Sequence, residues 1–309
     1  MAMKIGLLIS HKNTEILQNT INREFPDCTF YTLPDLIDEK DIDVLIAWKY
    51  PPGIIKYFKN LKLICSYGAG VDHLIADPDL PAHVPLTRFV DITLASAMTR
   101  YILMCVTHEE FRLSGLKYNQ GLKKWNPELI NDRNISIGIM GLGALGMHTA
   151  LTLHHLDYQV YGWCKHEKVN TPFKVYTENQ IQDFLHKVNI IVCLLPLTSA
   201  TFEILNQSLF QELKKGSTLI NVGRGEHVNI EDLLAAIADG TLSSVWLDVF
   251  AEEPLPEDSP LWSIPEITIT PHIASITDQK ALGKQVAMNM KSLVSGGSLL
   301  YLVNRDLGY

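Results

Sequence analysis

The stretch ISIGIMGLGALGMHTA, Ile135–Ala150, decides the fold class of this chain. Its apolar start, Ile135–Met140, predicts a buried strand, and three glycines follow as G-x-G-x-x-G where a helix can begin. In such a turn Gly141 permits a tight bend, Gly143 lets the backbone approach a pyrophosphate, and Gly146 lets the helix pack on the strand. The free N–H groups of the helix then face the anion. The stretch therefore predicts a dinucleotide-binding turn. The alternative is a glycine-rich turn without a ligand, which the flanking strand and helix disfavour.

The length and composition of the chain fit two globular domains. A chain of 309 residues exceeds the size at which single hydrophobic cores usually stop growing. With 47% hydrophobic and 19% charged residues, nothing limits core formation. The net charge of −8 gives no electrostatic footprint for nucleic acid or an anionic membrane surface. It does not exclude an anionic substrate, because a local cluster of cations can dominate within a pocket.

The cysteines and histidines bear on compartment and metal binding. The five cysteines are odd in number and far apart in mostly apolar runs, which predicts buried free thiols and a reducing compartment. The N-terminal segment is too short for a secretory signal, and the apolar segment Ala95–Thr107 is interrupted by Arg100 and too short to span a membrane. We therefore expect a cytoplasmic protein. The histidines form no zinc-binding motif, so no metal site is predicted.

Before the fingerprint, β-rich runs alternate with helical patterns, which predicts a parallel α/β sheet. Strands are predicted at Lys4–Ile9, Cys28–Leu33, Val44–Ala47 and Leu61–Cys65, and helices at Thr14–Phe25 and Gly53–Phe58. Two of these strands lead into the loops Trp48–Pro52 and Ser66–Asp72, at the end where parallel sheets bind ligands. Gly68 and Gly70 would expose N–H groups suited to a carboxylate. An ordinary turn for these glycines and a core position for Trp48 are equally open.

A second α/β unit follows the helical pattern at Thr93–Tyr118, for which Gly115 is the predicted stop. Its strands are predicted at Ile135–Met140, Tyr158–Trp163, Ile190–Leu195, Thr218–Val222, Ser244–Val249 and Ile267–Thr270, and its helices at Leu145–His155, Glu178–His186, Gln207–Leu213 and Ile230–Asp239. The last helix, Asp278–Leu293, is expected to pack on the first domain. The predicted fold is α/β, with two Rossmann-like or flavodoxin-like parallel-sheet domains and the active site in the cleft between them. The substrate domain comprises residues 1–99 and 275–309, and the dinucleotide domain residues 100–274.

Three polar residues stand where strands of the second domain end. Arg224 lies in NVGRG, Glu253 follows in LDVFAEEP, and His272 lies in TPHIAS. A guanidinium between glycines can form a two-pronged contact with a carboxylate. A histidine can exchange a proton near neutral pH, and a nearby carboxylate favours its charged form. Each residue also has a non-functional interpretation. Arg224 could be a surface arginine, Glu253 a solvated acid in a loop and His272 a helix cap. Their combination on one cofactor sheet predicts a catalytic site.

These motifs resemble those of the D-isomer-specific 2-hydroxyacid dehydrogenases, over nearly the whole chain. The shared features are the glycine fingerprint, LPLT with Thr201, NVGRG, DVF through EPLP, Leu261-Trp262, TPHIAS and, in the first domain, GAGVD at Gly68–Asp72. Within the family, the W-x-x-P-P stretch from Trp48, Trp125 and the terminal R-x-x-G-Y are most similar to the glyoxylate/hydroxypyruvate reductase A group. The chain departs from the family near Tyr101, where a hinge-helix glutamate is usual and Met98–Arg100 stands instead.

The resemblance implies an enzyme and a role for each polar residue. Arg224 would hold the substrate carboxylate and polarise the ketone, and His272 would protonate the carbonyl oxygen as hydride arrives. Glu253 would keep His272 protonated and oriented. The substrate site would be completed by Trp48, Gly68, Ala69 and Gly70.

The same resemblance implies which residues surround the dinucleotide. They are Gly141, Gly143, Ala144, Leu145, Gly146, Trp163, Cys164, Lys165, Lys168, Leu195, Pro196, Thr201, Val222, Gly223, Asp248, His272 and Ala274. Asp248 would face the nicotinamide, with a strand-end cap as the alternative. An NAD enzyme is expected to carry Asp or Glu after its second strand, whereas Cys164 stands here and Lys165 and Lys168 suit a 2′-phosphate. We predict NADP(H), with NAD(H) as the alternative because Glu167 lies in the same stretch.

The leading hypothesis is a reductase of small 2-keto acids, glyoxylate or hydroxypyruvate, that forms the D-hydroxy acid. One alternative is a dinucleotide-sensing binding protein of the same fold, which the absence of a basic tail disfavours. Another is a dehydrogenase for a different acid, such as phosphoglycerate or a branched keto acid. By analogy with the family, a homodimer is expected through the helix Thr93–Tyr118 and the arm that reaches Trp125.

Overall fold

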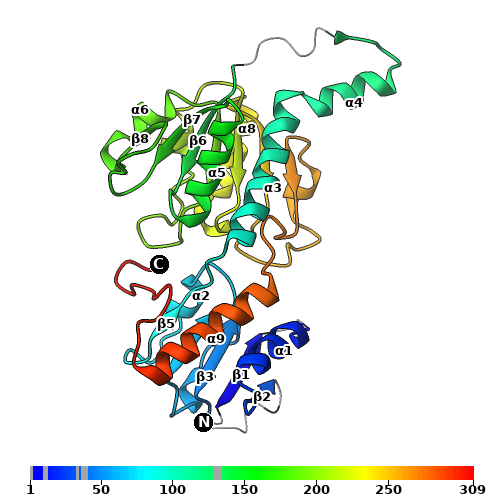
Figure 1. Cartoon of the computed structure of the whole chain (residues 1–309). Helices are drawn as coiled ribbons and strands as arrows, with labels where there is room; N and C mark the ends of the chain where they lie inside the picture. The colour runs from blue at the N-terminus through cyan, green and yellow to red at the C-terminus, as the bar shows by residue number, and fades with distance from the viewer. Residues whose placement is uncertain (1–2, 10–12, 33–34, 36–40, 128–133) are drawn as a thin grey trace. The chain divides into compact units, whose positions relative to one another are not determined.

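The computed structural model describes residues 3–9, 13–32, 35, 41–127 and 134–309. The chain forms two compact units (Figure 1). The first comprises Met1–Leu94 and Thr277–Tyr309, and the second comprises Ala95–Ile276. The sequence places these boundaries at residues 99 and 275.

The first unit is built on a five-stranded parallel sheet in the order β2-β1-β3-β4-β5. Its strands are β1 (Lys4–Ile9), β2 (Thr29–Thr32), β3 (Val44–Trp48), β4 (Leu63–Ser66) and β5 (Leu86–Thr87). This is the flavodoxin-like order, which reverses between β1 and β3. Leu33, the last residue of the predicted second strand, lies outside the described residues. The sequence did not predict β5, because two residues are too few to show a pattern.

Segments from both ends of the chain meet in the first unit. Its helices are α1 (Glu15–Glu24), α2 (Asp72–Ile75), α9 (Gln279–Ser295) and the 3₁₀ helix η2 (Ile55–Tyr57), which is one turn long. The backbone of α9 approaches α1 closely, since a Cβ added at Gly283 would lie 2.8 Å from Cβ of Thr20. The predicted helix Gly53–Phe58 is wrong beyond that one turn, because Gly53 has a positive φ of 87° and the segment extends again at Phe58.

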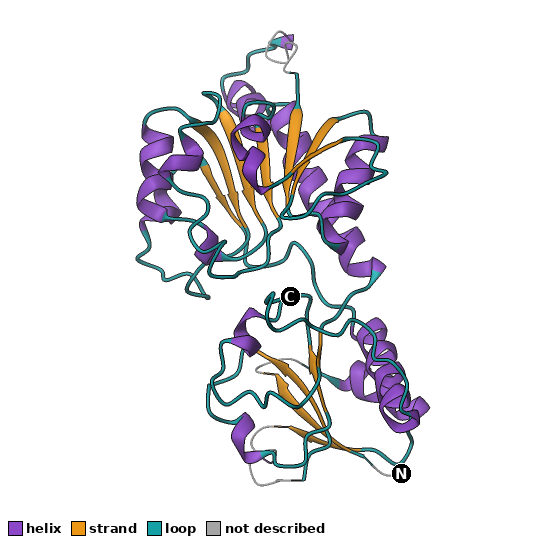
Figure 2. Cartoon of the chain, turned by 90° about the vertical axis from the view of Figure 1, so that its left-hand side faces the viewer, coloured by secondary structure: helices purple, strands orange, loops and turns teal. Residues whose placement is uncertain are grey.

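The second unit is built on a seven-stranded parallel sheet in the order β12-β11-β10-β9-β6-β7-β8 (Figure 2). Its strands are β6 (Ser136–Met140), β7 (Gln159–Trp163), β8 (Lys174–Tyr176), β9 (Ile190–Cys193), β10 (Ser217–Asn221), β11 (Leu242–Leu247) and β12 (Ile267–Ile269). This is the doubly wound dinucleotide-binding order with one added strand, and it reverses between β6 and β9. The sequence did not predict β8, which has only three residues.

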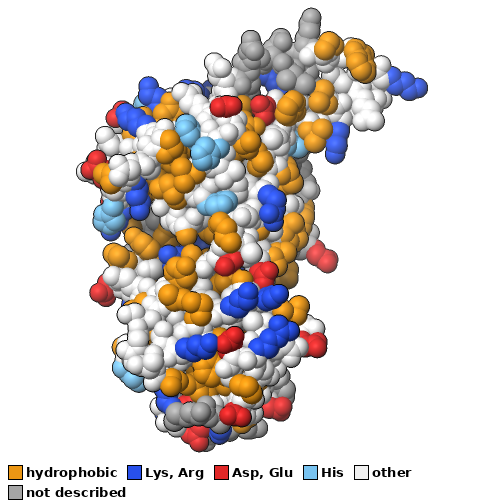
Figure 3. All heavy atoms as spheres, in the orientation of Figure 1, with side chains coloured by type: hydrophobic (Ala, Val, Ile, Leu, Met, Phe, Trp, Pro, Cys, Tyr) orange, Lys and Arg blue, Asp and Glu red, His pale blue; other side chains and the backbone are white. Residues whose placement is uncertain are grey.

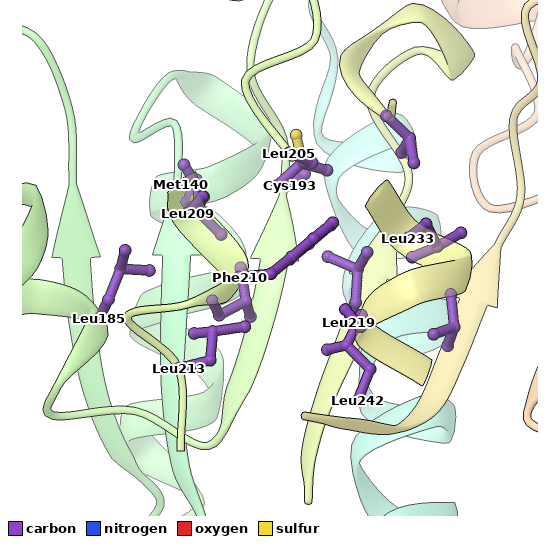
Figure 4. Close-up of a cluster of buried hydrophobic side chains, with 14 of the residues drawn as sticks. Met140, Leu185, Cys193, Leu205, Leu209, Phe210, Leu213, Leu219, Leu233 and Leu242 are labelled. Carbon is purple, nitrogen blue, oxygen red and sulfur yellow. The ribbon is translucent and has the colours of Figure 1, made fainter. Parts of the chain in front are cut away.

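Helices cover both faces of this sheet. They are α3 (Ile92–Glu110), α5 (Ala144–His155), α6 (Ile181–Leu185), α7 (Gln207–Phe210) and α8 (Ile230–Ala238), with 3₁₀ turns η4 (Glu178–Gln180), η5 (Gly225–His227) and η6 (Pro260–Ser263). A further helix, α4 (Leu113–Gly121), has no buried residue and does not pack on the sheet. α3 and α5 pack on the face to which β9 presents Ile190 and Val192. α6, α7 and α8 pack on the other, to which β9 presents Ile191 and Cys193 (Figure 4). Because both faces are buried, the strands read as continuous apolar runs.

The predicted helix Thr93–Tyr118 is two helices, α3 and α4. They are separated at Arg112, whose φ of 47° is left-handed, and α4 departs from the direction of α3 (Figure 1). Gly115 lies inside α4, so its prediction as the stop is wrong. The apolar spacing continues across the break, and a periodic pattern therefore does not reveal it.

The register of the second sheet brings the polar residues to one edge. The row of paired strand ends runs through Met140, Cys193, Asn221, Leu247 and Ile269. Because the strands are parallel and end level with one another, the loops that follow them all lie at the carboxyl edge of the sheet. Doubly wound sheets bind ligands at this edge.

Candidate active site

The glycine fingerprint forms a tight strand-to-helix turn after β6. Gly141 has a φ of 101°, a conformation that side chains rarely adopt, and a Cβ there would lie 2.7 Å from the carbonyl oxygen of Leu194. A Cβ on Gly146 would lie 1.8 Å from the carbonyl oxygen of Gly141, so only glycine lets α5 pack this close. A Cβ on Gly143 would meet nothing within 4 Å. Gly141 and Gly146 therefore lie where the turn packs against backbone, and Gly143 lies on the side of the turn that is open.

The open side of the turn is the N-terminus of α5. The helix begins with the hydrogen bond from the Met147 N–H to the Gly143 carbonyl, at 2.9 Å. The N–H groups of Ala144, Leu145 and Gly146 precede that bond and have no acceptor within the helix. Gly143 and Ala144 are exposed. This end can accept a pyrophosphate, because its dipole and N–H groups favour an anion.

The segment after β7 presents cations. Cys164 follows the buried Trp163, and its thiol donates to the carbonyl oxygen of His166 at 3.0 Å. Burial raises the pKa of the Cys164 thiol, so that it is uncharged at neutral pH. Lys165 and Lys168 are exposed. The end of β7 thus offers two ammonium groups, with Glu167 exposed between them.

The loop after β9 is held by two side chains. The Thr201 hydroxyl donates to the carbonyl oxygen of Pro196 at 2.6 Å, next to the buried Leu195. His227 is fully buried, and its Nδ1 accepts the Arg224 N–H at 3.0 Å. Its Nε2, 3.3 Å from the Pro196 carbonyl oxygen, must then be the protonated nitrogen. Sequence reasoning missed His227, because nothing in its local pattern distinguishes it from other histidines.

Arg224 is placed by the glycines beside it. A Cβ on Gly225 would lie 2.0 Å from the carbonyl carbon of Phe250, so the loop after β10 touches the loop that leads to Glu253. The Asn221 side chain donates to the Arg224 carbonyl oxygen at 2.8 Å, and the Arg224 guanidinium donates to the Gly223 carbonyl oxygen at 2.7 Å. Val222 is buried beneath this turn. Arg224 is half-buried, and a charge-assisted contact to an anion is stronger in such surroundings than in water.

His272 and Glu253 form a pair. Nδ1 of His272 lies 2.9 Å from Oε2 and 3.1 Å from Oε1 of Glu253. Oε1 also accepts the Phe250 N–H at 3.1 Å, which fixes the carboxylate. The side chains are 31% and 19% exposed, so the imidazole can be reached from solvent while the carboxylate lies behind it. Such a pair can hold and deliver a proton through Nε2.

Asp248 contacts the turn that carries His272. Its Oδ1 accepts the Ile273 N–H at 2.9 Å, and its Oδ2 accepts the Ala274 N–H at 2.9 Å. Both Asp248 and Ala274 are buried. The Asp248 carboxylate thus accepts backbone N–H groups just beyond the end of a strand. This is the capping role that the sequence leaves open as the alternative to a contact with the nicotinamide.

The expected substrate loop lies in the first unit, after β4. Ser66 braces it, since the Ser66 hydroxyl accepts the Gly68 N–H at 3.3 Å and donates to the Gly70 carbonyl oxygen at 2.9 Å. A Cβ on Gly68 would lie 2.5 Å from Cζ3 of Trp48, so the indole packs directly on this glycine. Gly68 is buried, while Trp48, Ala69 and Gly70 are half-buried. Ser66 is a second residue that sequence reasoning missed.

Other features of the described residues bear on the class of protein. All five cysteines are free thiols, of which Cys28 is half-buried and the others buried. No group of three or more metal-ligating side chains is found in the part of the chain that the structure describes. No helix within those same residues is long and apolar enough to cross a membrane.

Comparisons with known proteins agree on one family. Residues 110–274 match the family described as D-isomer specific 2-hydroxyacid dehydrogenase, NAD binding domain. The glyoxylate/hydroxypyruvate reductase A of Photorhabdus laumondii is 36% identical over 279 residues, which cover 88% of this chain and 89% of that protein.

Solved structures are similar over the whole chain. The NADPH-dependent glyoxylate/hydroxypyruvate reductase of Sinorhizobium meliloti, in complex with NADP and sulfate, has a TM-score of 0.92 and 30% identity, over 99% of this chain and 100% of that one. A D-isomer specific 2-hydroxyacid dehydrogenase of Xanthobacter autotrophicus, in complex with NADPH and MES, has a TM-score of 0.93 and 29% identity over 100% of both chains. The chain therefore belongs to the D-isomer specific 2-hydroxyacid dehydrogenase family.

Proposed function

We propose that this protein reduces small 2-keto acids, glyoxylate and hydroxypyruvate foremost, to 2-hydroxy acids with hydride from NADPH. The observation that carries the proposal is the His272–Glu253 pair, 2.9 Å apart, on the sheet edge that also carries the glycine fingerprint. The reductases named among the similar proteins supply the substrate class.

Three residues of the second unit have different roles in the proposed carbonyl reduction. Arg224 binds the substrate carboxylate and polarises the ketone. His272 gives its Nε2 proton to the carbonyl oxygen, and Glu253 stabilises the imidazolium from the Nδ1 side. When bound, a nicotinamide cofactor supplies the hydride. In the first unit, backbone N–H groups of the loop Gly68–Gly70 would bind the substrate carboxylate, and Trp48 is a further substrate-binding residue.

The fingerprint turn fits a dinucleotide, because the side on which a Cβ at Gly143 would meet nothing leaves room for a pyrophosphate. Lys165 and Lys168 are the residues that would hold the 2′-phosphate of NADPH, by charge-assisted hydrogen bonds. The complexes of the similar structures contain NADP or NADPH.

A turnover assay tests this function. The purified chain is mixed with NADPH or NADH and with glyoxylate, hydroxypyruvate, phosphohydroxypyruvate or a branched keto acid, and loss of reduced cofactor is followed. We expect the highest kcat/KM with NADPH and one of the first two acids. Binding of dinucleotide without turnover of any acid would favour the sensing protein, and preference for another acid would change the substrate only.

We also propose a cytoplasmic homodimer. Hydrophobic side chains gather over α3 and α4 in Figure 3, and the exposed apolar side chains from the middle of α3 onward are Met104, Phe111, Leu113, Tyr118, Leu122 and Trp125. Trp125 is 97% exposed, and a patch of this kind favours a protein partner. Light scattering should give twice the chain mass. Tyr118→Glu should lower it to one chain, whereas Val294→Glu on α9 should not. The free thiols support a reducing compartment.

A further inference from the structure

We propose that Thr270 and Tyr101 are positioning residues for His272, which they hold in place through the carboxylate of Asp248. The inference rests on the proposed reductase function. These residues form a chain of hydrogen bonds that orients the imidazole of His272 and takes no part in the proton or hydride transfer itself.

The backbone of His272 needs outside support. Its φ of 55° is left-handed, a conformation that is strained for a residue other than glycine. Three successive N–H groups of this turn donate to Asp248, and the first of them, that of His272, also donates to the Thr270 carbonyl oxygen at 3.0 Å. The His272 N–H donates to the carbonyl oxygen of Asp248 at 2.9 Å, and those of Ile273 and Ala274 donate to its Oδ1 and Oδ2, each at 2.9 Å. The position of the imidazole therefore depends on the position of the Asp248 carboxylate.

That carboxylate is itself held by a hydroxyl. The Thr270 hydroxyl donates to Oδ1 of Asp248 at 2.6 Å, and Asp248 is buried. Since Thr270 has one hydroxyl proton and gives it to Asp248, its oxygen accepts from the phenol of Tyr101, 2.7 Å away. Burial raises the pKa of Tyr101, so that its phenol keeps the proton it donates. The hydrogen bonds thus run in one direction, from Tyr101 through Thr270 to Asp248.

The chain of bonds connects two distant parts of the sequence. Tyr101 lies on α3, and Thr270 follows β12 two residues before His272. The Tyr101–Thr270 bond joins residues that are 169 positions apart. It anchors the turn of His272 to a helix that packs along the sheet, rather than to the loops around it.

The structure offers matched controls for both hydroxyls. Thr270→Val removes the hydroxyl and keeps the shape, and Thr270→Ser keeps the hydroxyl. Thr218 and Tyr176 are buried, and their hydroxyls have no hydrogen-bond partner among the described residues. Thr218→Val and Tyr176→Phe therefore make the same chemical changes as Thr270→Val and Tyr101→Phe, away from His272.

We expect Thr270→Val to lower kcat about 10- to 100-fold, because a misaligned acid loses most of its contribution to the rate. The Kd for NADPH should stay within about twofold, since the fingerprint is untouched. Tyr101→Phe should show a smaller loss of kcat. Thr270→Ser should restore the rate, and neither control should change it. A wild-type kcat in Thr270→Val, or an equal loss in Thr218→Val, would overturn the proposal.

Hydrogen exchange tests the same arrangement without the reaction. In Thr270→Val, the amides of Ile273 and Ala274 should exchange at least about tenfold faster, because their common acceptor is loosened, whereas Thr218→Val should leave them slow. Unchanged exchange in Thr270→Val would refute the positioning role. If exchange changes as expected but the wild-type chain reduces no keto acid, the proposed function fails and the hydrogen-bond chain stands.

Discussion

Nδ1 of His272 lies 2.9 Å from Oε2 of Glu253, although the two residues are 19 positions apart in the chain. The register of the sheet brings β11 and β12 side by side, with Leu247 paired to Ile269, so that both residues leave the same edge. The contact leaves Nε2 of the imidazole as the nitrogen that can reach a substrate.

The pair predicts a loss of chemistry without a loss of cofactor binding. His272→Asn should reduce kcat by about 10²- to 10⁴-fold, because the proton donor is removed, and Glu253→Gln should reduce it less. The Kd for NADPH, measured by fluorescence titration, should stay within about twofold in both variants. Full turnover by His272→Asn would show that another group donates the proton.

The two lysines after β7 predict the choice of cofactor. Replacing Lys165 and Lys168 together with Ala should raise the KM for NADPH at least about tenfold, since charge-assisted contacts to the phosphate are lost. The KM for NADH should not rise. Lys187→Ala is the control, because this exposed lysine precedes β9, at the opposite edge of the sheet. An equal rise for both cofactors would contradict a role in reading the 2′-phosphate.

The glycine fingerprint predicts two different defects. Gly146→Ala places a methyl group 1.8 Å from the Gly141 carbonyl oxygen, and such overpacking costs about 1–3 kcal/mol or more. Its thermal midpoint should therefore fall. Gly143→Ala meets no atom, so its midpoint should stay near that of the wild type while its affinity for NADPH falls. If Gly143→Ala binds NADPH normally, the pyrophosphate does not pass that side of the turn.

The contact between His73 and Trp48 predicts an effect on substrate binding. The two rings meet edge to face, with centroids 4.6 Å apart, while the indole packs on Gly68. An aromatic pair of this kind contributes about 0.5–1.5 kcal/mol, so His73→Ala should raise the KM for the keto acid up to about tenfold. The kcat should hardly change. His73→Phe keeps a ring and should restore the KM; failure of this rescue would argue against the packing role.

Removing the buried hydroxyl of Thr218 should increase the stability of the second unit. Its hydroxyl is buried without a hydrogen-bond partner among the described residues, and a buried polar group in that state costs about 1–3 kcal/mol. Thr218→Val keeps the shape and removes the group. Differential scanning calorimetry should show a higher midpoint for the second unit. A lower midpoint would mean that the hydroxyl has a partner, such as an ordered water.

The spacing of apolar residues predicted most strands and helices of both units. These elements are stabilised by burying one or both faces, and the apolar residues of a buried face recur at regular intervals in the sequence. The spacing failed where an element was too short or where one residue changed direction. β5 and β8 have two and three residues, and the left-handed Arg112 interrupts an unbroken apolar pattern.

The sequence by itself determined the fingerprint turn and the chemical nature of Arg224, Glu253 and His272, because glycine spacing and side-chain type are local properties. Only the tertiary structure decided which groups hold these residues in place. His227 reaches Pro196 across 31 positions, and Tyr101 reaches Thr270 across 169. Such contacts depend on how strands pair and how helices pack on them, and no local pattern encodes the partner of a buried hydroxyl or imidazole.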